Sequence, residues 1–147
     1  MRIEPAVAGN LAAIRTLLTQ ANLPCADIDA ACVAHFQVVR ATNSDALTGI
    51  VGLEPYAPVG LLRSLAVAPE QHGAGIGTAL VDAIEASARA QGIAELVLLT
   101  TTAEHFFARH GYTVIARDAA PAALQSTREF AELCPASSVC MRKSIRT

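Results

Sequence analysis

The sequence contains no tryptophan, few aromatic residues and no apolar run long enough to cross a membrane. A membrane-spanning helix needs about 20 mostly apolar residues. The first ten residues, MRIEPAVAGN, carry no apolar block of the kind found in signal peptides. The formal net charge of −2 argues against a nucleic-acid partner and against a polybasic membrane contact. We therefore expect a cytoplasmic protein, and its 147 residues suit one domain.

Only four cysteines are present, Cys25, Cys32, Cys134 and Cys140. In a cytoplasmic domain we expect them to be free thiols that pack as small apolar side chains. Their spacing fits no zinc pattern. One alternative stays open, a metalloid or soft-metal site built from Cys32, His35 and the C-terminal pair.

The most informative stretch runs from Gly60 to Gln91 and is typical of a strand, a glycine-rich turn and a helix. Leu61 to Val67 is an apolar run of the length of a buried strand. The turn contains HGAGIG (72–77), and apolar residues then recur at helical spacing. The first N–H groups of a helix lack partners inside it, that end of the helix is positive, and glycines let a phosphate approach closely. The stretch therefore predicts a site for the pyrophosphate of a nucleotide-containing cofactor.

Two common nucleotide-binding patterns do not fit this turn. In the dinucleotide pattern G-x-G-x-x-G, Thr78 or Leu80 would stand in place of the third glycine. That pattern also requires an acidic residue at the end of the next strand, whereas Glu95 begins its strand. The phosphate loop of ATPases needs Gly-Lys-Ser/Thr, and Gly77-Thr78 lacks the lysine.

The turn does resemble the central motif of the GNAT N-acetyltransferases, which reads V-x-P-x-x-[RQ]-G-x-G-[ILV]-G between a strand and a helix. Residues 67–77, VAPEQHGAGIG, match at every position except His72, where the family usually has Arg or Gln. This departure leaves the backbone N–H groups of the turn in place but removes one cation. The resemblance implies that acetyl-CoA is the cofactor.

A second GNAT signature, N-x-x-A-x-x-F-Y-x-x-x-G-[FY], is similar to residues 100–112. Ala103 and Phe106 stand in the family positions, and Thr100 replaces the Asn. Phe107 replaces the Tyr whose hydroxyl often protonates the leaving thiolate in this family. A phenyl ring cannot donate a proton, so that role is vacant or is filled by another group.

Three further segments resemble a narrower branch of the family. They are residues 60–67, 98–107 and 120–141. They look like the small N-acetyltransferases found with arsenic-resistance operons and like the acetyltransferase part of N-acetylglutamate synthases. This resemblance covers nearly the whole chain. It implies a small, amino-acid-like amine as acceptor and allows a link to arsenic resistance and a homodimer.

Periodicity and turn residues divide the chain into alternating strands and helices. We expect strands at 1–5, 35–41, 47–54, 61–67, 95–102, 112–117 and 138–143, with a loop at 55–59. We expect helices at 7–22, 27–34, 76–91, 103–110, 121–124 and 126–133, the last entered through a capping box. The central strand, helix and strand predict a right-handed parallel βαβ unit. The fold class is α/β, a mixed and mostly antiparallel sheet with helices on both faces, in a single domain over 1–147. The GNAT resemblance implies the same order.

Two charged residues are candidates for the attack of a neutral amine on the thioester. Glu54 is the expected base, acting directly or through water, with a solvated loop carboxylate as the alternative. Arg63 lies in an otherwise apolar strand, where strand alternation puts Leu61, Arg63, Leu65 and Val67 on one face. Its guanidinium either binds a substrate carboxylate or forms a structural ion pair with Glu54 or another acid.

The family resemblance also places the cofactor. In these enzymes the two parallel strands diverge, the pantetheine arm lies in the gap, and a backbone N–H near Leu65 to Val67 stabilises the oxyanion. The candidate cofactor-binding residues are Leu65, Ala66, Val67, His72, Gly73, Ala74, Gly75, Ile76, Gly77, Thr78, Thr100, Phe106 and Phe107.

Two other functions stay open at this point. One is an acyl-CoA-binding sensor or a cysteine-based metalloid-binding protein on the same fold, suggested by the replaced Tyr and the four cysteines. The other is a generic nucleotide-binding module, which the motif comparison disfavours.

Overall fold

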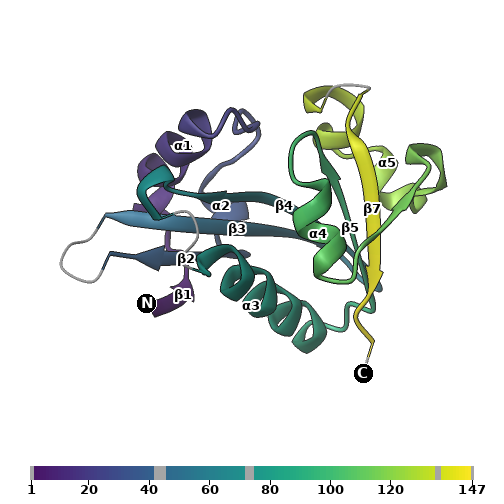
Figure 1. Cartoon of the computed structure of the whole chain (residues 1–147), viewed down its shortest axis with the longest axis horizontal. Coiled ribbons are helices and arrows are strands. Elements are labelled where there is room, and N and C mark those ends of the chain that lie inside the picture. Colours follow the sequence, from purple (N-terminus) through teal and green to yellow (C-terminus); the bar gives the residue numbers. More distant parts are fainter. Residues whose placement is uncertain (1, 42–45, 72–74, 135–136, 147) are drawn as a thin grey trace.

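The computed structural model describes residues 2–41, 46–71, 75–134 and 137–146. These residues form a seven-stranded sheet with the strand order β1-β2-β3-β4-β5-β7-β6 (Figure 1). Neighbouring strands are antiparallel except for the central pair of β4 and β5. The strands are β1 (Arg2–Pro5), β2 (Phe36–Arg40), β3 (Leu47–Tyr56), β4 (Val59–Val67), β5 (Glu95–Thr100), β6 (Thr113–Ile115) and β7 (Val139–Ser144).

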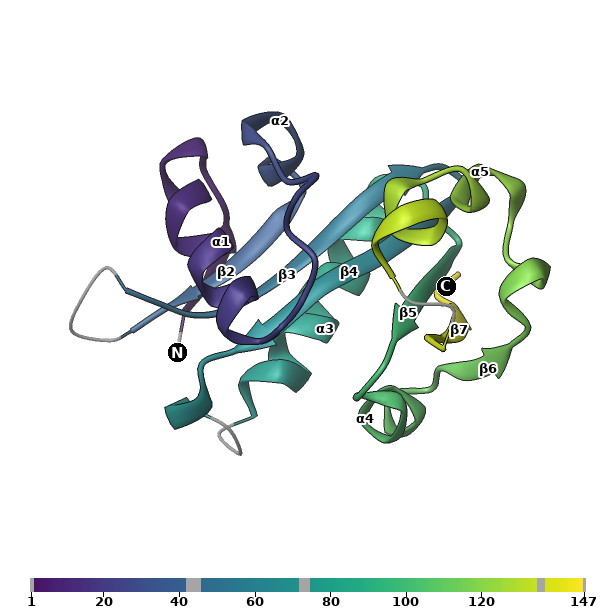
Figure 2. The ribbon, with the colours of Figure 1, turned by 90° about the horizontal axis from the view of Figure 1, so that it is seen from above.

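Helices cover both faces of this sheet. The α-helices are α1 (Leu11–Gln20), α2 (Ala30–Val33), α3 (Ile76–Ala90), α4 (Glu104–Arg109) and α5 (Ala122–Gln125). Short turns add η1 (Ala8–Asn10), η2 (Pro69–Gln71), η3 (Arg117–Ala119) and η4 (Glu129–Leu133), the last with π-helical bonding. Figure 2 shows α1 and α2 on one face and α3 on the other. This arrangement confirms the predicted α/β class and the parallel βαβ unit. Among the described residues, no helix is long and apolar enough to cross a membrane.

Several local predictions differ from the structure. The loop predicted at 55–59 is reduced to a turn at Ala57 and Pro58, because β3 and β4 continue as a hairpin in which Pro55 pairs with Gly60. The helix predicted to start at Asp27 begins at Ala30, and its N-cap is Asp29, whose side chain accepts a hydrogen bond from Cys32 N at 2.9 Å. Asp27 is therefore free for a different contact.

The middle of β4 contains a β-bulge. Gly52 of β3 pairs with Arg63, but Ile50 pairs with Ala66, so one residue of β3 faces two residues of β4. Ser64 in the bulge has φ 61°, a left-handed conformation that is uncommon for a residue with a side chain. A bulge of this kind bends a strand and redirects the side chains that follow it.

The predicted alternation along β4 is wrong as a result. Arg63 lies opposite Gly52, whereas Leu65 and Val67 pack with the residues under α3. Leu61 belongs to a separate cluster with Val97. The extra residue of the bulge moves the last two apolar side chains of β4 to the opposite face from the guanidinium.

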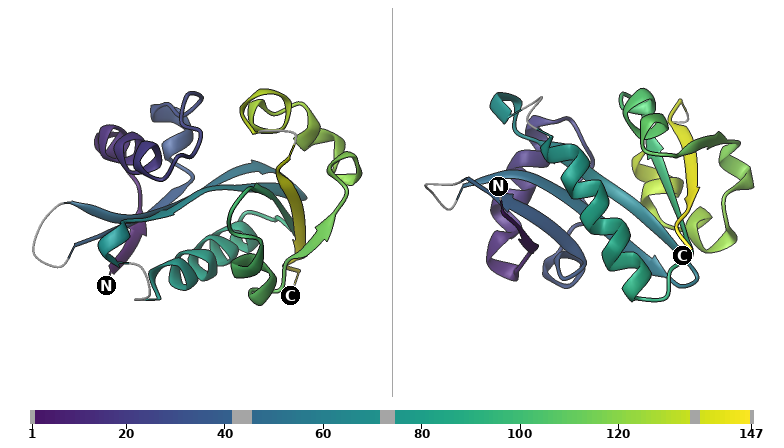
Figure 3. Two further views of the ribbon diagram at one scale, coloured as in Figure 1. Left: turned by 45° about the horizontal axis from the view of Figure 1, so that its top comes forward. Right: turned by 60° about the horizontal axis from the view of Figure 1, so that its bottom comes forward.

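Helix α3 packs closely on the sheet through the predicted apolar stripe. Ile76, Leu80, Ile84 and Ala88 are all buried, and Figure 3 shows the helix crossing one face of the sheet. A Cβ built on Gly49 would lie 2.9 Å from Ile76 and Leu80. The glycine in β3 therefore lets the start of α3 approach the strands that form the site.

Candidate active site

The central feature of the site is an opening between the two parallel strands. Within the described residues, β4 and β5 pair only at Val59–Glu95, Gly60–Leu96 and Leu61–Val97. Beyond these pairs β4 continues to Val67 and β5 to Thr100 without pairing to each other. The sheet is therefore split from Leu62 onward, as the family resemblance implied.

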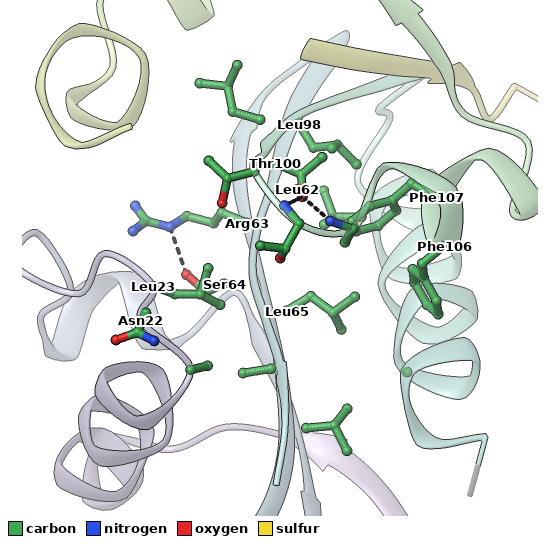
Figure 4. Close-up of a pocket in the computed structure, with 18 of the residues that line it drawn as sticks. Asn22, Leu23, Leu62, Arg63, Ser64, Leu65, Leu98, Thr100, Phe106 and Phe107 are labelled. Carbon is green, nitrogen blue, oxygen red and sulfur yellow. Dashed lines mark hydrogen bonds between the residues drawn. The ribbon is translucent and has the colours of Figure 1, made fainter. Parts of the chain in front are cut away.

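A cavity of about 1070 Å³ occupies this opening. Figure 4 shows Leu62 to Leu65 on one side and Phe106 and Phe107 on the α4 side. The predicted cofactor-binding residues that the structure describes all line it; they are Leu65, Ala66, Val67, Gly75, Ile76, Gly77, Thr78, Thr100, Phe106 and Phe107. His72, Gly73 and Ala74 lie outside the described residues.

The N-terminal end of α3 opens into the cavity. Gly75 is the N-cap, with φ 79°, and the first turn contains no acidic side chain. The first hydrogen bond of the helix runs from Ala79 N–H to Gly75 O, at 3.1 Å. The N–H groups of the helical residues before Ala79 have no partner within the helix and point toward its N-terminal end. Gly77 lies next to Phe106, since an added Cβ would be 3.3 Å from that ring. This end of the helix suits an anion.

Helix α4 forms the opposite wall of the cavity. The ring of Phe107 is buried and meets Phe106 and Tyr112 edge-on, with ring centroids 5.2 and 5.4 Å apart. His110 stacks against Phe106 at 4.6 Å, and its Nε2 lies 3.3 Å from the Thr78 hydroxyl oxygen of α3. The two helices that flank the opening are thus in direct contact at its edge.

Thr100 connects the end of β5 to α4. Its hydroxyl oxygen accepts a hydrogen bond from Ala103 N at 2.9 Å, which is drawn in Figure 4. A longer bond of 3.4 Å comes from Thr102 N. The side chain therefore holds the turn into α4 while it also lines the cavity.

Arg63 is the centre of a buried charge cluster at one end of the cavity. The residue is 4% exposed, and its guanidinium forms a two-pronged ion pair with Asp27, with Nη2 at 2.8 Å from Oδ1. Its Nη1 also donates to Glu54 Oε1 at 2.7 Å, and its Nε donates to Ser64 Oγ at 3.0 Å. Glu129 Oε1 lies 3.8 Å from the same Nε. Of the two predicted roles for Arg63, these contacts are those of the structural ion pair.

The cluster shifts the pKa values of its members. Burial works against the charge of Arg63, but the hydrogen bonds that it donates to Asp27 and the charges of Glu129 and Asp27 raise the pKa of the guanidinium above its usual value. Burial also opposes ionisation of Asp27, yet the Arg63 hydrogen bond and charge lower the pKa of that carboxyl. At neutral pH, Arg63 and Asp27 are therefore both charged.

Glu129 behaves differently from Asp27. Its burial, together with the nearby charges of Glu54 and Asp27, raises the pKa of the carboxyl to about 7 although Arg63 acts in the opposite direction. One oxygen, Oε2, is buried and has no hydrogen-bond partner among the described residues. A buried polar atom without a partner is costly and suggests that a ligand or water completes it.

The predicted base, Glu54, is a neighbour of the cavity without lining it. Its Oε1 accepts from Arg63, and its Oε2 accepts from the Tyr56 hydroxyl at 2.9 Å. Burial and this hydrogen bond raise the pKa of Tyr56 to about 12, so the phenol stays protonated at neutral pH. Both oxygens of Glu54 are thus engaged by protein groups.

Asp27, Glu129 and Ser138 are among the polar residues of the site that were not predicted. Ser138 lines the cavity, and its buried hydroxyl has no partner among the described residues. Asp27 lies in a loop. Glu129 stands at the last position of the predicted capping box, so a capping role had already accounted for its carboxylate. In the structure Glu129 instead lies beside Arg63. The contacts of Asp27 and Glu129 with Arg63 join segments far apart in the chain, so no local sequence pattern indicates them.

The cysteines do not combine into a metal site in the described part of the chain. All four are free thiols. No group of three or more His, Cys, Asp or Glu side chains there is arranged to hold a metal ion. The metalloid-binding alternative therefore gains no support from these residues.

Comparison with known sequences identifies the domain. Residues 33–114 match the family described as "Acetyltransferase (GNAT) domain". The chain is 38% identical over 82 residues to an amino-acid acetyltransferase of Ralstonia nicotianae, covering 54% of this chain and 18% of that protein. It is 36% identical over 100 residues to an amino-acid acetyltransferase of Pseudomonas fluorescens, covering 68% of this chain and 19% of the relative. The chain thus spans less than a fifth of the length of these curated relatives.

Solved structures share the whole architecture. The N-acetylglutamate synthase of Neisseria gonorrhoeae, solved with coenzyme A and N-acetyl-glutamate, superposes with a TM-score of 0.84 at 21% identity over 99% of this chain and 35% of that one. A Mycobacterium tuberculosis protein solved in complex with CoA gives 0.81 at 23% identity, over 98% of this chain and 99% of that one. These likenesses show the fold, and the family match covers more than half of the chain. The chain belongs to the GNAT acetyltransferase family.

Proposed function

We propose that this protein transfers the acetyl group of acetyl-CoA to the amine of a small, amino-acid-like acceptor. The observation that supports this most directly is the split between β4 and β5, which leads from the N-terminal end of α3 to the charge cluster at Arg63. An elongated thioester cofactor needs an anion site at one end and an acceptor site at the other. The start of α3 would provide the anion site, and the charge cluster at Arg63 would provide the acceptor site.

In this proposal the cofactor follows the cavity. The pyrophosphate binds at the start of α3, with Gly75, Gly77 and Thr78 near it; His72, Gly73 and Ala74 are further ligands predicted from the sequence. The pantetheine arm enters the split as an additional strand along Leu65, Ala66 and Val67. Phe106, Phe107, Ile76 and Thr100 pack around the arm. The backbone N–H groups after the bulge are the proposed donors to the oxyanion, and loss of one such donor typically costs about 100- to 1000-fold in rate.

The reaction that follows is a direct transfer. A neutral amine nitrogen attacks the thioester carbon and forms the C–N bond, and collapse of the intermediate breaks the C–S bond. The nitrogen loses a proton, and the CoA thiolate gains one. An amino acid carries a protonated amine near pH 7, so a basic group must first remove that proton.

The choice of acceptor rests on similarity. The curated relatives are named amino-acid acetyltransferases, and the Neisseria structure holds N-acetyl-glutamate. The resemblance to acetyltransferases of arsenic-resistance operons adds arsenic-containing amino acids to the acceptors worth testing. Dimers are common in the GNAT fold, so a homodimer stays a prediction, which light scattering tests.

The test has two independent parts. Calorimetry with acetyl-CoA is expected to show saturable binding that NAD and ATP do not compete with. A thiol-release assay with a panel of amino acids, including glutamate and arsenic-containing analogues, is expected to show turnover with at least one amine. Binding of NAD or ATP in place of CoA would point to a generic nucleotide-binding module. Absence of both acetyl-CoA binding and turnover would refute the proposal.

A further inference from the structure

The three carboxyl groups around Arg63 differ in what their oxygens contact. Asp27 uses both oxygens on the guanidinium. Glu54 uses one oxygen on Arg63 and the other on the Tyr56 hydroxyl. Neither of these two residues lines the cavity. Each oxygen of these two carboxylates is therefore already bonded to a protein group outside the lining of the cavity.

Glu129 differs from both in position and in contacts. It lines the cavity, is 4% exposed, and approaches Arg63 only through Oε1, at 3.8 Å from Nε. Its Oε2 is buried without a partner in the described part of the chain. The buried hydroxyl of Ser138, which also lines the cavity, is the second polar atom there without a partner. Two oxygens without hydrogen-bond partners in the wall of one cavity can accept hydrogen bonds from the N–H groups of a ligand.

The surroundings of Glu129 also favour proton exchange near neutral pH. Burial and the charges of Glu54 and Asp27 raise the pKa of its carboxyl, and the charge of Arg63 lowers it. The resulting pKa is about 7. Cys134, which follows η4, has its thiol pKa raised to about 12, first by burial and then by the charge of Glu129, so it stays neutral. A base works best when its pKa lies near the working pH.

We propose that Glu129 accepts the proton of the acceptor's ammonium group, with the Ser138 hydroxyl as a second hydrogen-bond acceptor that orients it. This inference rests on the proposed acetyl transfer. The ammonium N–H bond breaks, the proton moves to Oε2 of the carboxylate, and the nitrogen keeps the electron pair that attacks the thioester. The proton then leaves to solvent. Glu129 thereby takes the role that the sequence alone suggested for Glu54.

The decisive variant is Glu129→Gln, which keeps the shape of the side chain and removes its basicity. We expect kcat to fall at least about 100-fold, the usual scale for loss of a general base, and the acidic limb near pH 7 to disappear, leaving only the rise at higher pH that deprotonation of the amine itself causes. Acetyl-CoA affinity measured by calorimetry should stay unchanged. Glu129→Asp should keep the acidic limb at reduced rate. Glu132→Gln, an exposed carboxyl on the same turn, is the matched control and should leave the profile unchanged.

Glu54→Gln separates the two candidate bases. We expect it to slow the reaction while the acidic limb persists, because Glu129 remains. If Glu54→Gln removes the limb and Glu129→Gln does not, the inference is wrong although acetyl transfer stands. If wild-type protein binds no acetyl-CoA, the proposed function fails and this inference fails with it.

A direct titration covers the case in which acetyl-CoA binds but no amine of the panel reacts. The carboxyl carbon of Glu129 in carbon-13-labelled protein, assigned by its loss in Glu129→Gln, should titrate with a midpoint near its pKa of about 7. A midpoint at the ordinary value of 4.5 would overturn the inference. Such a carboxylate would be no better a base than an exposed one.

Discussion

The Tyr112 hydroxyl donates a hydrogen bond of 2.9 Å to Glu85 in the middle of α3. Lys143 of β7 donates to both oxygens of the same carboxylate, at 2.9 and 3.0 Å. Glu85 is 4% exposed, so this network is largely shielded from water. Because α3 packs under β3 and β4 while Lys143 belongs to the half of the sheet beyond the split, the network links the two walls of the cavity.

Replacing Glu85 with alanine should therefore destabilise the whole domain. Removal of one partner leaves the Lys143 charge and the Tyr112 hydroxyl without their acceptor, at a cost of about 3 kcal/mol. The free energy of unfolding from urea titration measures this loss. Asp82→Ala, an exposed carboxyl on the same helix, should change it by less than about 0.5 kcal/mol. Equal effects of the two variants would contradict a structural role for the network.

Close packing at Gly52 makes a second prediction. An added Cβ would lie 2.5 Å from the ring of Phe36. Gly52→Ala should cost about 1–3 kcal/mol, because the ring must move within a packed core. Gly9→Ala is the control, since nothing lies within 4 Å of the Cβ added there. Thermal unfolding should show a lower Tm for Gly52→Ala and little change for Gly9→Ala.

The anion site at α3 is tested by adding a negative charge. Gly77→Glu should weaken acetyl-CoA binding at least about 10-fold, because the new carboxylate and side chain would occupy the space of the pyrophosphate. Ala86→Glu adds the same group to an exposed position of the helix and should leave the affinity unchanged. Calorimetry gives both values. Unchanged affinity in Gly77→Glu would place the phosphates elsewhere.

We expect the loss of Arg63 to act mainly on the stability of the fold and less on the reaction itself. In Arg63→Ala the carboxylates of Asp27 and Glu54 lose their cation in a partly buried site, and loss of a buried partner costs about 3–5 kcal/mol. Arg63→Lys should recover part of this, since lysine keeps the charge but not the fork of five donors. A folded Arg63→Ala protein of normal stability that fails only in acceptor binding would favour the substrate-carboxylate role instead.

The raised pKa of Glu129 predicts how stability depends on pH. Since the pKa is higher in the folded protein than its ordinary value of 4.5, the folded state holds a proton that the unfolded chain has released. The contribution of Glu129 to stability is therefore complete below about pH 4.5 and is lost as the pH rises to about 7. The shift corresponds to a loss on the order of 3 kcal/mol.

Glu129→Gln cannot ionise and should lack this loss. The difference in unfolding free energy between the variant and the wild type should grow in favour of the variant between about pH 5 and about pH 8. Urea titrations at several pH values measure the difference. A difference that stays constant with pH would show that the carboxyl titrates normally.

Local patterns were enough to predict much of the fold. The apolar stripe of α3 and the approximate positions of the strands follow from spacing within one element. The predicted loop at 55–59 shows the limit of such reasoning, because Pro55 and Val59 are held in strands by their partners across the hairpin. The bulge at Ser64 has the same origin, since pairing with β3 decides which face Leu65 and Val67 occupy.

The amino-acid sequence by itself determined the family and predicted residues that line the cavity, because these depend on neighbours a few residues apart. The tertiary structure alone decided which carboxyl groups surround Arg63. Asp27 lies 36 residues before it, and Glu129 comes from a turn beyond β6. Contacts between such distant segments, and the burial that moves the pKa of Glu129 away from that of Asp27, arise only when the chain packs into one core.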